Sequence, residues 1–229
     1  MSQTNKLDTL KKKFIFKNVG NLGRFGLAER EAYYLISKDS NNCVYVLKIY
    51  KLNKKKDYSG FNHEVHMSQF ITNGEIHFPA KIVDSWIVEN NGYIQLRCLK
   101  NAIKWKDLSV DKAPRAFRMI TQQLKYIHKL KLFHGDLASK NIVVNSNGLA
   151  SIIDFEDVGK LTSRKEKKDW ESLQYVFSPY TPEALLEIKN SSLLSKKDKK
   201  ARLDFSKKNE ILSKILSKYI PQKYKMINL

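Results

Sequence analysis

The sequence predicts an α+β fold in which a small antiparallel β-sheet carrying one helix precedes a mainly helical second half. Two patterns predict this division. Between residues 14 and 52, aromatic and β-branched runs alternate with Gly, Ser, Asn and Asp, which is typical of antiparallel hairpins. Between residues 113 and 132, apolar side chains recur at helical spacing behind Pro114. A hydrophobic share of 42% indicates a packed core and excludes a disordered chain.

The first half is expected to hold three strands, one helix and two further strands. Glycine and asparagine mark the turn before the last of these strands, at residues 89–92. A basic linker, residues 51–60, is expected to precede the helix. The expected strands are 14–16, 32–36, 44–50, 79–88 and 92–99, and the expected helix is 61–71.

The second half is expected to be helical around one compact β segment. Residues 134–158 contain two short β runs joined by a turn, and helices return from Asp169. Residues 178–182 and the lysine-dense residues 196–208 are expected to separate those helices. We therefore predict three regions: a flexible basic tail (1–13), a β-sheet lobe (14–99) and a helical lobe (100–229).

The chain is strongly basic, with 42 Lys and Arg against 23 Asp and Glu, so its net charge is 42 − 23 = +19. Such an excess is compatible with a plain solvated surface or with an anionic partner, namely a nucleic acid, a ribonucleoprotein or an acidic protein. Charge alone does not choose between them.

Cysteine usage and hydropathy predict an intracellular protein of the cytoplasm or nucleus. Cys43 and Cys98 are far apart and match no disulfide framework or zinc spacing, so reduced thiols are expected. No run of about 18 apolar residues is present, which argues against a membrane partner.

Three polar residues have the spacing of a divalent-metal site. Asp136 and Asn141 are 5 residues apart, and Asp154 follows 13 residues later, after an expected β-hairpin that would return it to the other two. Two carboxylates and a carboxamide offer the hard oxygen ligands that Mg²⁺ prefers, with Mn²⁺ as the alternative ion. Because Mg²⁺ takes its remaining ligands from phosphates, a nucleotide, ATP, is the implied companion.

Here the sequence resembles the protein-kinase-like superfamily, whose catalytic loop reads HxDxxxxN and whose metal loop reads DFG. His134 to Asn141 matches the first motif and Asp154-Phe155-Glu156 the second. The resemblance spans roughly residues 16–177 and implies a bilobal fold with a truncated helical lobe. Matching positions for the glycine loop are Gly20, Gly23 and Gly26; for the lysine strand, Lys48; and for its ion-pair partner, Glu64.

The resemblance implies a role for each matched residue. Asp136 would orient or deprotonate the attacking hydroxyl, and Asn141 and Asp154 would hold the metal. Lys48 would bind the α- and β-phosphates, under the glycine loop, while Glu64 pairs with Lys48. Lys140 joins the catalytic candidates, and Leu96 and Leu99 the nucleotide-binding ones.

Several positions depart from the protein-kinase pattern. Gly135 replaces the arginine that reads a phosphorylated activation loop, so no such switch is expected. Ala138 and Lys140 leave the acceptor open between Ser/Thr and Tyr hydroxyls. Glu156 replaces the glycine of DFG, as in choline-kinase-like enzymes.

The interval after the metal loop is short. Asp169, which resembles the aspartate that braces the catalytic loop, follows Asp154 by only 15 positions. This leaves no room for a full activation segment and is similar to RIO kinases and the small KEOPS-complex kinase. An alternative match at residues 180–183 is less favoured.

Three functions are compatible with these residues. The favoured one is a compact atypical protein kinase acting on a protein substrate. The others are a small-molecule kinase of the choline or aminoglycoside type and a nucleotide-binding pseudokinase scaffold. Only 229 − 154 = 75 residues follow Asp154, which leaves little chain for a small-amine pocket. Retention of the five matched polar residues argues against a scaffold.

Overall fold

The computed structural model describes residues 4–21, 30–40, 42–179 and 181–225. The chain forms two compact units. The first unit comprises residues 1–102 with 151–158, and the second unit comprises residues 103–150 with 159–229. The first crossing between them lies close to the boundary predicted at residue 99. The assignment of residues 151–158 to the first unit is not part of that prediction.

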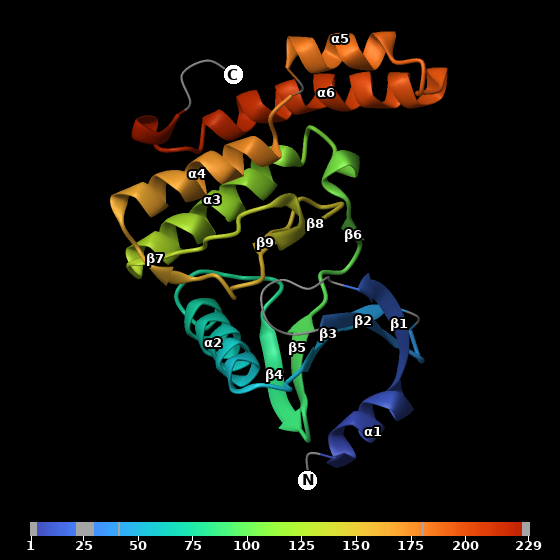
Figure 1. Cartoon of the computed structure of the whole chain (residues 1–229), viewed down its shortest axis with the longest axis vertical. Helices are drawn as coiled ribbons and strands as arrows, with labels where there is room; N and C mark the ends of the chain where they lie inside the picture. The colour runs from blue at the N-terminus through green and yellow to red at the C-terminus, as the bar shows by residue number, and fades with distance from the viewer. Residues whose placement is uncertain (1–3, 22–29, 41, 180, 226–229) are drawn as a thin grey trace. The chain divides into compact units, whose positions relative to one another are not determined.

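An antiparallel sheet of five strands forms the body of the first unit and confirms the strands expected from the sequence (Figure 1). Its order is β1-β2-β3-β5-β4, so β3 and β5 lie inside the sheet. The elements of this unit are α1 (Thr4–Lys13), β1 (Phe14–Asn21), β2 (Arg30–Ser37), β3 (Cys43–Lys51), α2 (Lys55–Thr72), β4 (Ile82–Val88) and β5 (Asn91–Arg97).

Alternation along β3 sends successive side chains to opposite faces of the sheet. Leu47 belongs to a cluster with Leu35 and Trp86, whereas Tyr50 belongs to a second cluster with Phe61 of α2. Because both faces are covered, β3 reads as a nearly continuous apolar run in which Lys48 is the one exception between Val44 and Ile49.

The N-terminal residues differ from the flexible tail expected from the sequence. They form α1, and Leu10, only 8% exposed, joins the cluster that contains Leu35 and Leu47. Leu7 lies three residues earlier, on the same helix face, and packs against the same cluster. Lysine-rich composition suggested a solvated tail, but these two leucines are enough to dock one helical turn.

Helix α2 begins six residues before the predicted start at Phe61, within the expected linker. Its first turn is stabilised by Asp57, whose carboxylate accepts hydrogen bonds from the backbone N–H groups of Asn53 and Lys54 at 3.1 and 2.9 Å. A carboxylate at this position satisfies backbone donors that the helix leaves unpaired.

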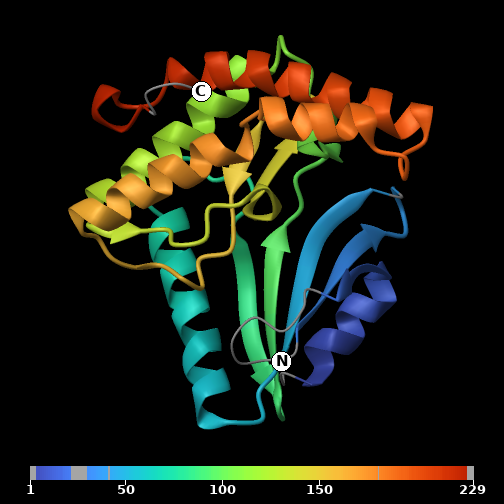
Figure 2. The ribbon, with the colours of Figure 1, turned by 45° about the horizontal axis from the view of Figure 1, so that its top comes forward.

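The second unit is mainly helical and contains several short strands. Helices α3, α4 and α6 pack on one another, and α5 lies along α6 (Figure 2). Strand β7 pairs with β10, β8 lies between β6 and β9 in the order of a three-stranded sheet, and β6 and β9 span residues at which the chain passes between units. The longer elements are α3 (Ala113–Lys129), α4 (Ser163–Val176), α5 (Pro182–Asn190) and α6 (Lys196–Ser217). The short ones are β6 (Ala102–Ile103), η1 (Trp105–Asp107), β7 (Leu132–Phe133), η2 (Ser139–Asn141), β8 (Ile142–Asn145), β9 (Ala150–Ile152), β10 (Gly159–Lys160) and η3 (Gln222–Tyr224).

The predicted stripe on α3 is buried as expected at Phe117, Ile120, Leu124 and Ile127. The expectation for the lysine-dense residues 196–208 is wrong, because they lie inside α6 and do not separate helices. Ser195 caps this helix by accepting a hydrogen bond from the Asp198 backbone N–H at 3.1 Å. Lysine is a good helix former, and buried residues farther along α6 fix it to the unit. No helix of the described residues is long and apolar enough to cross a bilayer.

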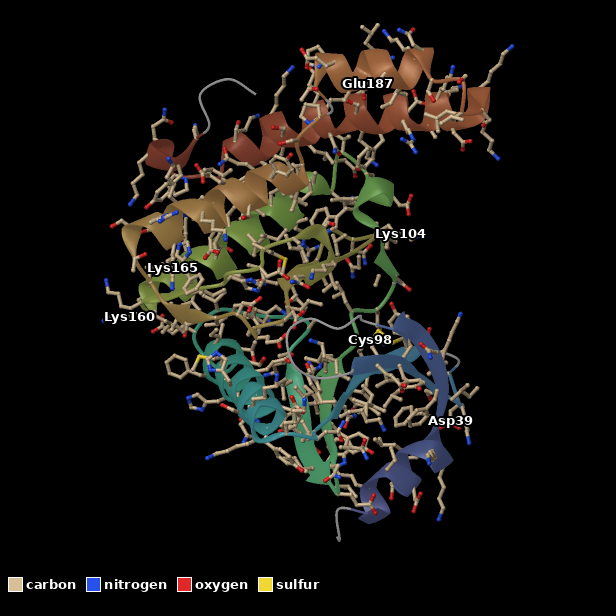
Figure 3. All side chains as sticks on the ribbon, viewed as in Figure 1. Asp39, Cys98, Lys104, Lys160, Lys165 and Glu187 are labelled. Carbon is tan, nitrogen blue, oxygen red and sulfur yellow. A yellow bond between two sulfur atoms is a disulfide. The ribbon has the colours of Figure 1, made fainter. Side chains whose placement is uncertain are left out.

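The two cysteines also differ from the expectation of reduced thiols. Cys43 opens β3, Cys98 follows β5, and the structure joins them in a disulfide with a Cα–Cα distance of 6.1 Å. Figure 3 labels Cys98 at this end of the sheet. The backbone N–H of Cys98 donates to the carbonyl of Val44 at 2.9 Å, so strand pairing brings together residues 55 apart in sequence. Sequence spacing alone does not reveal that adjacency.

Candidate active site

Lys48 is the centre of a buried ion-pair network in the first unit. Its Nζ lies 2.8 Å from Glu64 Oε1 of α2 and 2.9 Å from Asp154 Oδ1. Lys48 is 6% exposed and Glu64 is 2% exposed. Burial lowers the pKa of Lys48, but the nearby charges of Glu64 and Asp154 outweigh this effect and raise the pKa well above its usual value. The ammonium is therefore held charged.

Tyr50 is a component of this network that sequence reasoning missed. It follows Lys48 by two residues on β3, so the two side chains share one face of the sheet. Its buried hydroxyl donates to Glu64 Oε2, opposite the oxygen that Lys48 contacts. Burial, followed by the charge of Glu64, raises the pKa of Tyr50 well above its usual value. The sequence signal that could have revealed it is a tyrosine two residues after the lysine in a largely apolar strand.

The metal-loop residues lie in the same unit. Asp154 has a backbone φ of +69°, a left-handed conformation that is uncommon for residues other than glycine and that clusters at functional sites. Phe155 is buried edge-to-face against Phe78, with ring centroids 6.1 Å apart. His63 of α2 contacts the carbonyl oxygen of Val158 through Nε2 at 2.9 Å, which ties the loop to the helix.

The carboxylates of this loop have a suitable composition for a divalent cation. Oxygens of Glu64, Asp154 and Glu156 all lie within 4.8 Å of one another. Together with Lys48, these groups carry a formal charge of −2, and all three acids offer hard oxygen donors. Glu156, which the sequence analysis noted only as a departure, thus lies beside the predicted ligand Asp154.

The catalytic-loop residues gather in the second unit. The Asn141 Nδ2 donates to Asp136 Oδ2 at 2.9 Å and to the Asp136 carbonyl at 2.8 Å, closing the loop that contains η2. Lys140 Nζ lies 3.0 Å from the same carboxylate oxygen. Unlike Lys48, Asp136 is accessible, with 36% of its side chain exposed.

Asp169 of α4 braces this loop from beneath. Its carboxylate accepts hydrogen bonds from the backbone N–H groups of His134 at 2.8 Å and Gly135 at 3.1 Å, and His128 Nε2 lies 2.9 Å away. Gly135 has a φ of +90°, which a residue with a side chain adopts only with strain. The braced turn holds the backbone that carries Asp136. Asp169 therefore makes the contacts expected of the bracing aspartate, the role for which the sequence favoured it over residues 180–183.

The structure describes only some of the residues predicted to bind the nucleotide. Gly20 lies in β1 opposite Ala32 of β2, next to an irregularity in the pairing. Gly23 and Gly26 lie outside the described residues. Leu96 is partly buried on β5 and Leu99 is buried just beyond it.

The structure thus brings the predicted residues together within each unit. Lys48, Glu64 and Asp154 form one group, and Asp136, Lys140 and Asn141 form the other. The first group fixes a buried cation beside carboxylates. The second presents an accessible carboxylate on a rigid loop.

Comparison with known proteins gives the family. The model of the protein kinase domain matches residues 17–199. The serine/threonine-protein kinase pakA of Dictyostelium discoideum is 26% identical over 71% of this chain and 14% of its own length. The serine/threonine-protein kinase cst-1 of Caenorhabditis elegans is 32% identical over 46% of this chain and 21% of its own. The serine/threonine-protein kinase SKM1 of Saccharomyces cerevisiae is 43% identical over 20% of this chain and 7% of its own.

The matched segments are thus small parts of these longer relatives. The family match covers most of the present chain, including the strand of Lys48, the loop of Asp136 and the helix of Asp169. On that match, this chain belongs to the protein kinase domain family.

Proposed function

We propose that the chain is an ATP- and Mg²⁺-dependent protein kinase that transfers the γ-phosphoryl group to a Ser or Thr hydroxyl. The observation that carries this proposal is the contact of one buried ammonium, Lys48, with both Glu64 and Asp154. A buried cation paired on two sides is costly to maintain for stability alone, because desolvation offsets much of the attraction. The presence of this buried, paired lysine therefore supports a role in binding phosphates.

Residues of the first unit would bind the nucleotide. Lys48 would contact the α- and β-phosphates, with Glu64 and Tyr50 fixing its position. The backbone around Gly20, Gly23 and Gly26 would cover the phosphates. Leu96 and Leu99 would contact the base.

Asp154 would hold the metal ion together with Asn141, and the carboxylate of Glu156 is close enough to Asp154 to contribute. A bound Mg²⁺ or Mn²⁺ would neutralise charge on the phosphates. The oxygen donor set and the negative balance around Asp154 fit such an ion.

Residues of the second unit would act on the acceptor. The hydroxyl oxygen attacks the γ-phosphorus, the bond from that phosphorus to the β-bridging oxygen breaks, and ADP leaves with the bond electrons. The hydroxyl proton passes to the Asp136 carboxylate. Asn141 and the Asp169 brace hold Asp136 in place, and Lys140 offsets negative charge beside it.

We further infer that activity does not depend on phosphorylation of an activation segment. Gly135 offers no cation to read a phosphate, and eight residues separate Asp154 from the start of α4 at Ser163. The shortness of this segment supports the resemblance to RIO-type and KEOPS-complex kinases. A strained Asp154 inside a loop anchored to His63 is consistent with one fixed arrangement.

The test is transfer from labelled ATP with Mg²⁺, and in parallel Mn²⁺, to the chain itself, a basic protein, an acidic protein and a panel of amino-alcohols. Label on Ser or Thr of a protein is the expected result, and Asp154→Ala should abolish it. Asp111→Ala is the control, since Asp111 is exposed and its side chain interacts with its near neighbours Ser109 and Lys112. Label on amino-alcohols alone would replace the proposal with a small-molecule kinase, and the absence of transfer to any acceptor, with or without nucleotide binding, would replace it with a scaffold.

A further inference from the structure

A hollow of about 520 Å³ opens beside the catalytic loop, entirely within the second unit. One wall is the loop itself, residues 135–139. The other wall is formed by Lys168, Ser172, Tyr175 and Val176 of α4. These four residues fall at helical spacing on one face of α4, the same helix whose Asp169 braces the loop.

The segment between Asp154 and α4 is short. Of the eight residues between Asp154 and α4, Gly159 and Lys160 are used in pairing with β7. Tyr175 is 78% exposed, although large aromatic side chains are usually buried. An accessible tyrosine beside a reactive carboxylate is typical of a surface that contacts another molecule.

Among the residues that line the hollow, Lys168 supplies the positive charge and Asp136 the negative one. Other lysines of α4 are engaged: Lys167 lies 3.5 Å from Glu171, and Lys165, labelled in Figure 3, lies over the ring of Phe133. Lys168 is exposed, and within the described part of the chain no carboxylate lies within ion-pair distance of it. A cation at the wall is thus available to a bound partner.

We propose that the hollow receives the acceptor-bearing segment of a protein substrate that carries acidic side chains next to the target hydroxyl. Lys168 binds the acidic side chain, and Tyr175 and Val176 contact the rest of the segment. This inference rests on the proposed function and names its substrate class. A peptide is favoured over a nucleic acid because the hollow offers one lysine together with the side chains of Leu137, Tyr175 and Val176, which suit a single acidic side chain and its neighbours, whereas a nucleic acid would need several cations along its phosphates.

The experiment uses three serine-centred peptides of eleven residues, flanked by glutamates, alanines or lysines. Transfer gives KM and kcat for each. Binding is measured separately by fluorescence anisotropy on labelled peptides in which alanine replaces the central serine. We expect the glutamate peptide to bind best and the lysine peptide worst, with about a two- to fivefold step for an exposed charge pair.

Lys168→Glu should reverse this order, and the change should fall on peptide KM and affinity. Lys167→Glu is the matched control: it changes the net charge by the same amount on the neighbouring position, away from the hollow. It should keep the wild-type order. Tyr175→Ser should weaken all three peptides alike.

The inference is overturned if the wild type shows no preference among peptides, binds none of them, or keeps its preference in Lys168→Glu. It is also overturned if Lys168→Glu affects only binding of a single-stranded oligonucleotide. Preferential peptide binding without transfer to any acceptor would instead overturn the proposed function and leave this assignment standing.

Discussion

The two groups of polar residues differ in how they are held. In the first unit, Lys48, Tyr50 and Glu64 are buried and satisfy one another directly. In the second unit, Asp136 is partly exposed; Asn141 donates to its carboxylate and its carbonyl, and Asp169 holds the backbone of the two preceding residues. A nucleotide-binding cluster can be closed and preassembled, whereas a group that meets varied acceptors needs access and a rigid support. Substitutions in the two groups should therefore impair the protein in different ways, affecting stability and ATP binding in the first group and the transfer rate in the second.

The largest effect is expected from Asp136→Asn. The amide cannot take the hydroxyl proton, so the transfer rate should fall by about 10²- to 10⁴-fold. Because Asp136 is partly exposed, the free energy of unfolding and ATP affinity should change little. Single-turnover transfer and isothermal titration with ATP measure both. A parallel loss of ATP affinity would contradict the division of roles.

Asp169→Ala should act on stability and activity together. It leaves the buried backbone N–H groups of His134 and Gly135 without their acceptor, at about 1–3 kcal/mol for each unsatisfied group. Urea unfolding should show this loss, and transfer should fall because the loop is no longer held. Glu171→Ala, two residues away on an exposed side of α4, is the control. A variant of reduced stability but normal activity would show that transfer does not depend on the brace.

Tyr50→Phe tests the closed cluster. The ring and its packing against Phe61 remain, while the hydroxyl bond to Glu64 is lost. Bonds to charged groups contribute about 1.5–3 kcal/mol, so unfolding free energy should fall by about that amount and KM for ATP should rise. In a Glu64→Gln background, the same change should have a smaller effect. Full additivity of the two substitutions would deny the coupling.

The pH dependence of stability should reveal the same cluster. Lys48 and Tyr50 both have folded-state pKa values above the reference values of 10.5 and 10.0. Above pH 10 the unfolded chain loses these protons first, so the folded state binds more protons and stability falls as pH rises. The slope is at most about 1.4 kcal/mol per pH unit for each group. Urea titrations from pH 8 to 11.5 measure it, and Tyr50→Phe should reduce the slope.

The smallest effect is expected at an exposed ion pair. Lys214 lies 2.7 Å from Glu210 on α6, with both side chains mostly exposed. Such helical pairs contribute about 0.3–0.5 kcal/mol, and salt screens them. Lys214→Ala should therefore shift unfolding free energy by no more than this, and 0.5 M salt should erase the difference. A shift comparable to that of Tyr50→Phe would mean that surface charge also governs this fold.

Local pattern was sufficient for much of the fold. Alternation along β1 to β5 and the stripe on α3 depend on short-range periodicity, which the sequence displays directly. The placement of α1 was not accessible in this way, because two leucines in a lysine-rich segment do not show where they dock. Helix α6 was missed for the related reason that lysine density was read as a break.

The same limit on prediction from local sequence applies to the candidate site. Residues in ordered motifs, such as Asp136 and Lys48, could be located from spacing and resemblance. Tyr50 and the Cys43–Cys98 pair could not, because their partners are set by strand register and by the approach of α2. A single strand can show that a polar side chain is present, but it does not show which tertiary partner that side chain meets.

Helix α1 has a practical consequence for anyone who shortens this protein. The family match begins at residue 17, and trimming there would remove α1 and lay bare Leu35, Leu47 and Trp86 on one side of the sheet. A patch of that kind promotes aggregation. Laboratory versions intended for crystallisation or screening should keep residues 4–13, even though the family match starts after them.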